Sequence, residues 1–176
     1  MSQTVSLPVS LPLQHVRRFA RYNAWANTRL YDACAALPQA DYMAARPSFF
    51  GSLHNTLNHI LVGDSIWMGR FTAQPATHIT ALDQILHTDF AALRSARAAM
   101  DAAIIAFCDG LDDAALGGTF TYTNTRGQTF TDPLFPPLTH FFNHQAHHRG
   151  QAHGLLSQAG AAPPELDLIY FLRADA

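Results

Sequence analysis

The segment LTHFFNHQAHHRGQAH, from Leu138 to His153, decides how the rest of the chain is interpreted. It carries five histidines, and three of them, His140, His144 and His148, are spaced by four residues. Side chains four apart lie along one line of an α-helix, and Gln151 continues that line three residues later. Two imidazoles at i and i+4 can bind one metal ion, so the spacing predicts a metal-binding face on a helix.

The plain alternative is a histidine-rich helix face in water. The same segment and its continuation carry large apolar residues, which argue against a free surface helix. They are Phe141, Phe142, Leu155 and Leu156. Inward histidines need partners, because burying an unpaired polar group costs roughly 1–3 kcal/mol. We interpret His147 and His153, which point elsewhere on the helical wheel, as structural or surface residues. For His140 three roles stay open: orienting a ligand, serving as a spare ligand, or being solvated.

A third ligand has to come from a facing helix, and the segment from Leu53 to Phe71 offers His54 and His59. Five residues apart on a helix, these two diverge by about 140° and cannot face the same site. His59 lies mid-helix near Gly63, where helices can approach closely. His54 lies in the first turn, where a cap or surface role is expected. Spacing alone favours His59 by about two to one.

The rest of the sequence predicts helices joined by short loops. Apolar residues recur at helical spacing in several segments. We expect helices from Leu13 to about Pro38, from Leu53 to Phe71 after a Ser52 N-cap, from about Ala81 to Cys108 with Leu82 and Ile85 on its apolar side, from about Pro137 to Gln158, and from Glu165 to Arg173. Thr119 to Asp132 is rich in β-branched and aromatic residues around a turn, which indicates a hairpin. The prediction is an all-α four-helix bundle with a short β-hairpin before the last long helix. Residues 1–12 would be a flexible N-terminal arm, and residues 13–176 a single helical-bundle domain.

Composition narrows the class of protein. The chain has 176 residues, 48% of them hydrophobic and 14% charged, and a formal net charge of −2, which is not the basic footprint of a nucleic-acid binder. No apolar stretch approaches the roughly 18 residues of a membrane span, and no secretory signal is seen, so a cytoplasmic location is expected. The only cysteines, Cys34 and Cys108, lie in helical patterns and are expected to be buried free thiols.

Long segments of this chain resemble the DinB/YfiT-like helical bundles. The resemblance rests on YNAWAN (Tyr22–Asn27), GSLHNTLNHILVGDSIWMGRF (Gly51–Phe71) and FFNHQAHHRGQAHGLLSQAG (Phe141–Gly160), followed by PPELDLIYFLR. It implies a four-helix bundle with a three-histidine metal site, which by position falls on His59, His144 and His148. Family members are often dimeric, so a homodimer is implied as well. Characterised relatives include metal-dependent transferases that use low-molecular-weight thiols, and others are described as damage-inducible proteins or hydrolases.

Three neutral imidazoles would leave a position on the ion for a thiol, water or substrate. We therefore expect a metal-dependent enzyme acting on a small molecule, either a thiol-dependent S-transferase or a hydrolase. Imidazoles suit several transition metals, with zinc or nickel expected first and iron as a further candidate, together with a low-molecular-weight thiol. The alternative is a non-catalytic metal-binding protein of the DNA-damage or stress response. A further alternative is a bundle whose histidines bind nothing.

Several other residues are weaker candidates for orienting ligands or contacting substrate: Asn23, Asn27, Asp64 and Gln151. The alternative to a role at the site is an ordinary structural one, namely an interhelical hydrogen bond for each asparagine and a solvated carboxylate for Asp64. Trp25 and Trp67 could line a pocket, although core packing is the simpler expectation.

Overall fold

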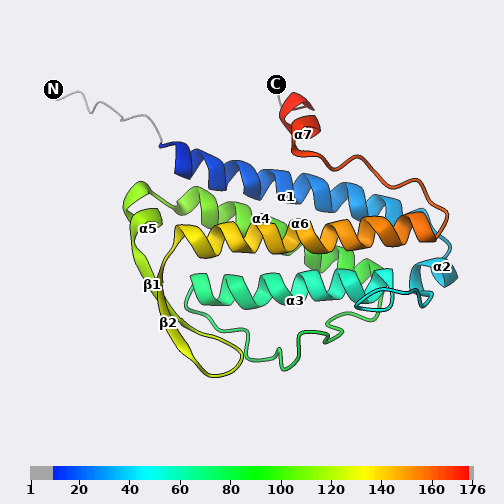
Figure 1. The fold of residues 1–176 in the computed structure, drawn as a ribbon, viewed down its shortest axis with the longest axis horizontal. Helices are drawn as coiled ribbons and strands as arrows, with labels where there is room; N and C mark the ends of the chain where they lie inside the picture. The colour runs from blue at the N-terminus through cyan, green and yellow to red at the C-terminus, as the bar shows by residue number, and fades with distance from the viewer. Residues whose placement is uncertain (1–9, 175–176) are drawn as a thin grey trace.

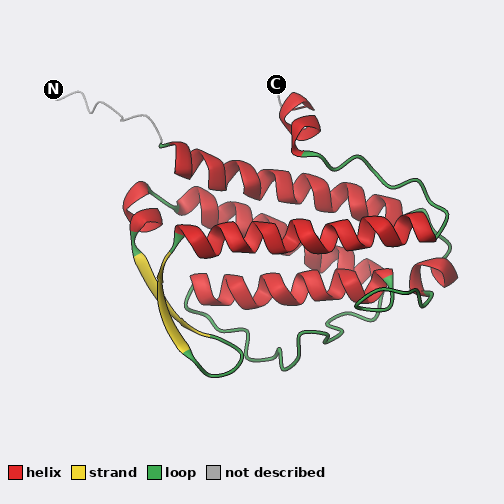
Figure 2. Ribbon diagram, in the orientation of Figure 1, coloured by secondary structure: helices red, strands yellow, loops and turns green. Residues whose placement is uncertain are grey.

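Four long helices pack side by side in the computed structural model, which describes residues 10–174 (Figures 1 and 2). They are α1 (Leu11–Ala35), α3 (Leu53–Phe71), α4 (Phe90–Gly110) and α6 (Phe135–Gln158). Each contacts two of the others, in the cyclic order α1, α4, α3, α6. The colour gradient in Figure 1 shows that α3 and α4 run in one direction and α1 and α6 in the other. The predicted all-α four-helix bundle is confirmed.

Within residues 10–174, five shorter elements lie at the ends and sides of the bundle. They are α2 (Gln39–Met43), α5 (Asp113–Gly117), β1 (Thr119–Thr123), β2 (Thr129–Pro133) and α7 (Leu168–Ala174). The two strands pair antiparallel, with Thr121 opposite Thr131, which confirms the predicted hairpin. Gly127 in its turn has a φ of 77°, a conformation that glycine adopts without strain. Helices α2 and α5 are single turns that the sequence pattern did not predict, and α7 begins three residues later than expected.

Side-chain caps define where the first two long helices begin. The Ser10 hydroxyl accepts a hydrogen bond from the backbone N–H of Leu13, and Pro12 lies in the first turn, where its missing N–H is harmless. Residues 11 and 12 are therefore helical instead of part of the predicted arm, whose residues 1–9 lie outside the described residues. Ser52 caps α3 as predicted.

The third predicted helix, Ala81 to Cys108, is wrong at its N-terminal end. Residues 72–89 form a loop that runs back along α3, which allows α3 and α4 to lie parallel (Figure 1). Helix α4 starts only after Asp89, whose carboxylate accepts a hydrogen bond from a free backbone N–H of the first turn. Leu82 and Ile85 are exposed in the loop instead of packing in the core.

The core consists of two apolar clusters separated by a polar layer. One cluster includes Leu13, Val16, Ile104 and Leu138, and the other includes Leu30, Leu57, Leu93 and Leu155. The buried polar residues between them along the four helices include Asn23, Asn27, Asp64, Arg97, Asp101, Gln145 and Arg149. None of the helices in the described part of the chain combines the length and the apolar character needed to cross a membrane.

Candidate metal centre

The antiparallel packing of α3 against α6 brings the predicted histidines together. Positions four apart on one helix face positions four apart on the other, so His59 meets His148, and one turn further on Gly63 meets His144. One side-chain nitrogen from each of His59, His144 and His148 lies within 4.8 Å of the other two. Within residues 10–174 this group contains no fourth histidine, cysteine or carboxylate. The contributor from α3 is His59, not His54.

Neighbouring acceptors fix the tautomers of two of the rings. Nδ1 of His59 lies 2.7 Å from the carbonyl oxygen of Leu82, and Nδ1 of His148 lies 2.8 Å from Oε1 of Gln151. In a neutral ring each Nδ1 therefore carries the proton, and each Nε2 presents a lone pair. The two Nε2 atoms face each other at 3.1 Å, close to the roughly 3.3 Å expected for two nitrogens bound to one tetrahedral zinc ion.

All three rings are held in the neutral form. Burial lowers the pKa of His59 and of His148, because an imidazolium is poorly solvated in the bundle. Burial, followed by repulsion from the surrounding imidazoles, lowers the pKa of His144 to about 3. A shared proton between the facing nitrogens is therefore disfavoured near neutral pH, whereas a metal cation would satisfy both lone pairs.

Close packing holds the third ring. A Cβ atom at Gly63 would lie only 2.6 Å from Cε1 of His144, so the glycine gives that imidazole its space. Nδ1 of His144 is buried and has no hydrogen-bond partner among the described residues. An unpaired buried group of this kind costs roughly 1–3 kcal/mol, and a metal ion bound at Nδ1 itself would remove that cost. Phe50, which the sequence did not single out, stacks on His59 at 4.0 Å and meets His148 edge-on.

Asn58, the residue before His59, fixes the loop that orients His59. Its Oδ1 accepts hydrogen bonds from the backbone N–H groups of Leu86 and His87 at 2.9 and 3.0 Å, and its Nδ2 donates to the carbonyl of His87 at 3.2 Å. These bonds hold the segment that presents the Leu82 carbonyl to the ring. Sequence reasoning missed both Asn58 and this carbonyl, because only the path of the loop reveals them.

His54 is buried and structural, so the cap or surface role expected for it is wrong. Its Nδ1 lies 2.9 Å from the Tyr42 hydroxyl, and its Nε2 lies 3.2 Å from Nδ2 of Asn58. It therefore supports the residue that fixes the loop over His59.

The remaining histidines of α6 lie outside the cluster. His140 is exposed, and its ring packs against Trp67 with centroids 5.3 Å apart. His147 is exposed, as expected for a surface position, and its Nε2 lies 3.2 Å from Nε2 of Gln151. His153 is half-buried, with its Nε2 3.1 Å from the carbonyl of Pro164.

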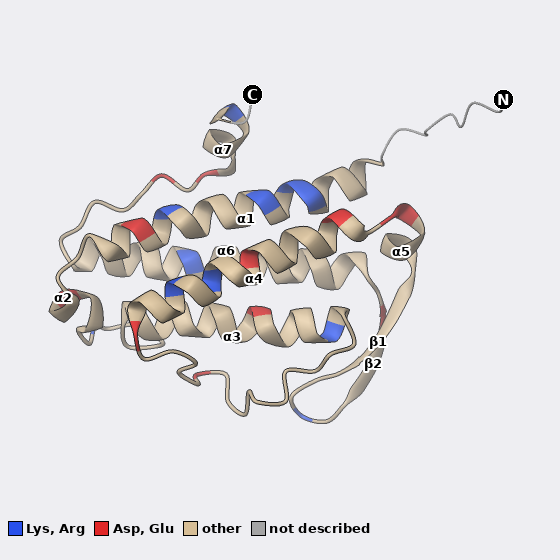
Figure 3. Cartoon of the chain, turned by 180° about the vertical axis from the view of Figure 1, so that it is seen from behind, with Lys and Arg blue, Asp and Glu red and all other residues tan. Residues whose placement is uncertain are grey.

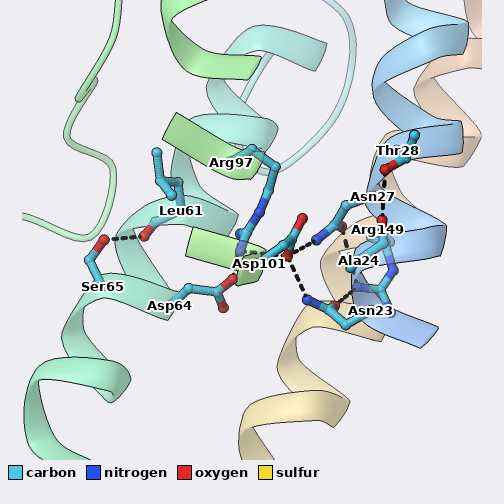
Figure 4. A network of polar contacts seen from close by, with 10 residues as sticks. All are labelled: Asn23, Ala24, Asn27, Thr28, Leu61, Asp64, Ser65, Arg97, Asp101 and Arg149. Carbon is cyan, nitrogen blue, oxygen red and sulfur yellow. Dashed lines mark hydrogen bonds and ion pairs between the residues drawn. The ribbon is translucent and has the colours of Figure 1, made fainter. Parts of the chain in front are cut away.

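Asp64 belongs to the polar layer in the bundle centre, not to the histidine cluster (Figure 4). The Arg97 guanidinium lies between its carboxylate and that of Asp101, with N···O distances of 2.5 and 2.8 Å. Burial raises the pKa of Asp64, and the charge of Arg97 opposes this rise. The solvated carboxylate expected from the sequence is wrong, because Asp64 is 0% exposed.

Asn23 and Asn27 connect this layer to α1. Each donates a hydrogen bond from Nδ2 to Oδ1 of Asp101, at 3.1 and 2.9 Å. Each also accepts from the buried Arg149 guanidinium of α6 (Figure 4). The interhelical hydrogen bonds expected as the ordinary alternative are therefore observed.

Both cysteines are free and buried, as predicted. Burial raises the pKa of Cys34 and of Cys108 to about 12. Neither thiol ionises near neutral pH, so neither is a nucleophile of the resting protein. Of the tryptophans, Trp25 packs against Tyr22 and Phe171, whereas Trp67 lies beside His140 at the edge of the histidine cluster.

The fold and the site together define a helical-bundle protein with three histidines converging between two antiparallel helices. The profile of the DinB family matches residues 1–175, and the chain belongs to this family. Protein DinB of Bacillus subtilis (strain 168) is 25% identical over 158 residues, which are 86% of this chain and 91% of that protein. The crystal structure of a DinB-like protein from Bacillus cereus ATCC 10987 superposes with a TM-score of 0.61 over 84% of this chain and 94% of the other. At 17% identity the second similarity concerns the fold alone.

Proposed function

We propose that this protein is a metal-dependent enzyme in which His59, His144 and His148 hold one divalent transition-metal ion. The observation that carries the proposal is the pair of Nε2 atoms of His59 and His148, which face each other at 3.1 Å while each Nδ1 lies beside an oxygen acceptor. Neutral imidazole donors suit zinc and nickel, which we expect first, and iron as a further candidate.

The donor set favours an open site. The group contains three nitrogen donors and no further side chain of a metal-binding type among the described residues, so an ion would have positions for water or substrate. A bound ion lowers the pKa of a thiol or water that reaches it. The proposed reaction is transfer of a low-molecular-weight thiol to a small electrophile, or hydrolysis of a small molecule. In the transfer, a sulfur–carbon bond forms, the leaving group departs with the bonding electrons, and the thiol proton passes to solvent.

The chain's own residues position the donors and shield them. The Leu82 carbonyl and Gln151 direct the Nε2 lone pairs of two rings into the cluster. Phe50 covers His59 and the edge of His148, which limits the access of water from that side. The homodimer implied by the resemblance and the cytoplasmic location remain predictions.

Metal content of protein purified without an affinity tag tests the site. Wild type should contain close to one equivalent of metal, and His148→Ala should lose it. His153→Ala is the matched control, because His153 lies on the same helix outside the cluster. The ion should also raise the melting temperature of wild type but not of His148→Ala, since it binds only the folded state. Equal metal content in His148→Ala and wild type would refute the assignment.

Turnover tests the enzymatic part separately. Glutathione and model electrophiles should be consumed faster by the metal-loaded protein than by the metal-free protein. Metal binding without any such difference, for thiol transfer or hydrolysis, would instead favour a non-catalytic metal-binding protein of the stress response.

A further inference from the structure

A second candidate site lies at the end of α3 that faces the hairpin. A pocket of about 390 Å³ opens there between the last turns of α3, the loop that follows and strand β1. Arg70 and Tyr122 line it, together with polar side chains of the hairpin such as Thr121 and Asn124. Figure 3 shows the positive charge at this end of α3.

The Arg70 guanidinium is held by aromatic rings instead of by an acid. Its Cζ lies 4.5 Å from the ring centroid of Trp67 and 5.3 Å from that of Tyr122. Within residues 10–174 it forms no ion pair or hydrogen bond. Asp132 on the facing strand accepts its hydrogen bond from the Tyr122 hydroxyl, at 3.0 Å. Burial lowers the pKa of Arg70, and the neighbouring Tyr122 opposes this shift. The pocket therefore contains a partly desolvated fork of N–H donors without an acceptor among the described residues.

The wall opposite the hairpin is fixed in place. A Cβ at Gly69 would lie 2.7 Å from the carbonyl oxygen of Gln74 and 3.0 Å from the backbone nitrogen of Ala76, so the loop packs directly on the helix. Ala73, which lines the pocket, has a φ of 55°, a conformation that a non-glycine residue rarely adopts. This close packing fixes the position of the loop wall against α3.

An ordinary role for Arg70 is to stabilise the C-terminal end of α3 through the helix dipole. That role requires a cation in the last turn, but it requires neither a pocket nor two rings that hold the guanidinium beside it. The two roles differ in one measurable respect, because only a ligand site distinguishes an anionic from a neutral small molecule.

We propose that this pocket binds the carboxylate of a small organic molecule, with Arg70 as the anchor. A guanidinium pairs with a carboxylate through two parallel hydrogen bonds. The pocket lies at the negative end of the α3 dipole and offers, among the described residues that line it, a single cation, Arg70. A phosphate dianion would therefore keep an uncompensated negative charge there, whereas the single charge of a carboxylate is matched by Arg70.

The pocket lies along the side of α3 that also carries His59 and Gly63, because Ile66 and Arg70 follow these residues at helical spacing. The rings of His144, His140, Trp67 and Tyr122 follow one another with centroids 6.0, 5.3 and 5.5 Å apart. Arg70 lies seven positions after Gly63, the residue beside His144, which is about 10 Å along the helix axis. The substrate therefore carries a carboxylate about 10 Å from the atom that reaches the metal. This extension rests on the proposed function.

A pair of thiols of equal length provides the test. Protein loaded with cobalt(II) would be titrated with 8-mercaptooctanoate and with the neutral 8-mercaptooctan-1-ol, following the sulfur-to-cobalt charge-transfer band. Wild type should bind the carboxylate about tenfold more tightly, as expected for a charge-assisted hydrogen-bonded pair. Arg70→Gln should remove the difference, and Arg126→Gln, which removes an exposed arginine of the hairpin turn, should retain it.

The outcomes separate the two proposals. Equal affinities of the two thiols in wild type, or a preference that persists in Arg70→Gln, would overturn the carboxylate site even if the cobalt band forms. Absence of cobalt(II) absorption bands even before thiol is added would overturn the proposed metal site instead. Arg70→Met, which retains an unbranched stem on Trp67, replaces Arg70→Gln if the latter unfolds, and the same result is expected.

Discussion

Replacing Gly63 with alanine should weaken metal binding far more than it changes the stability of the metal-free fold. The new Cβ would lie 2.6 Å from Cε1 of His144, whereas carbon atoms in van der Waals contact lie about 3.5–4.0 Å apart. The imidazole must therefore move by roughly 1 Å. Because that ring is the free end of a side chain, it can move without displacing the backbone, but the movement takes its nitrogen away from the other two donors.

The two expected magnitudes differ. Losing the support of a ligand commonly costs about 10–100-fold in metal affinity, so moving the ligand itself should cost at least that much. Alanine in the middle of a helix gains about 0.5–1 kcal/mol over glycine, and crowding costs about 1–3 kcal/mol. The free energy of unfolding of the metal-free protein should therefore decrease by no more than about 2.5 kcal/mol.

Calorimetric titration with zinc or nickel, and denaturant unfolding in the presence of a chelator, measure the two quantities. Gly150→Ala is the matched control, since it makes the same substitution in α6, where an added Cβ meets nothing within 4 Å. It should leave metal affinity unchanged and slightly stabilise the protein. Wild-type affinity in Gly63→Ala would show that His144 is not a ligand, and the reasoning from its packing would fail.

Arg97→Met should lower the free energy of unfolding by about 3–5 kcal/mol, because it leaves Asp64 buried without its ion-pair partner; a loss under 1 kcal/mol in denaturant unfolding would contradict this. Asn58→Ala should free the loop over the cluster, with faster amide exchange at residues 82–87 and about 10–100-fold weaker metal binding, and unchanged affinity would remove its positioning role. Burial raises the pKa of Cys34 and of Cys108 from 9.0 to about 12, so above pH 9 the unfolded state releases these protons first and the folded state is penalised. The free energy of unfolding should thus decrease from about pH 9 to about pH 12. Replacing both cysteines with alanine should make that decrease less steep, the remainder coming from Tyr31 and Tyr42, whose pKa values burial also raises; an unchanged slope would contradict the assignment.

The periodicity of the sequence was sufficient to predict the regular helices. The apolar spacing located α1, α3 and α6, and the four-residue spacing of His144 and His148 placed both on one face. Helix geometry alone favoured His59 over His54 without deciding between them. Which side of α3 packs against α6 depends on how the whole bundle is packed, and the spacing within one helix does not reveal it. The resemblance to the DinB/YfiT-like bundles indicated which side of the helix carries the ligand.

The sequence could not reveal contacts made through irregular segments. Leu82 and Ile85 have helical spacing, yet they lie in a loop, because the Asn58 side chain takes the backbone groups that a helix would have paired. Asp64 looked like a surface residue because its partner, Arg97, lies 33 positions away on another helix. Both errors have one cause: a polar side chain from a distant element decided the local structure.

The polar layer also bears on the histidine cluster, although it contributes no donor to it. Arg97 pairs with Asp64 and Asp101, and Asn23 connects Asp101 to Arg149, so that directional bonds link the layer at one level of the bundle. Apolar contacts alone tolerate a helix that slides or rotates, whereas such bonds are satisfied in one register, and buried polar groups are known to fix register in helical assemblies. The convergence of His59 and His148 requires that register of α3 against α6. We therefore expect Arg97→Met to weaken metal binding as well as stability, although Arg97 is not part of the histidine cluster. A destabilised variant that still binds metal with wild-type affinity at low temperature would restrict the layer to a role in stability.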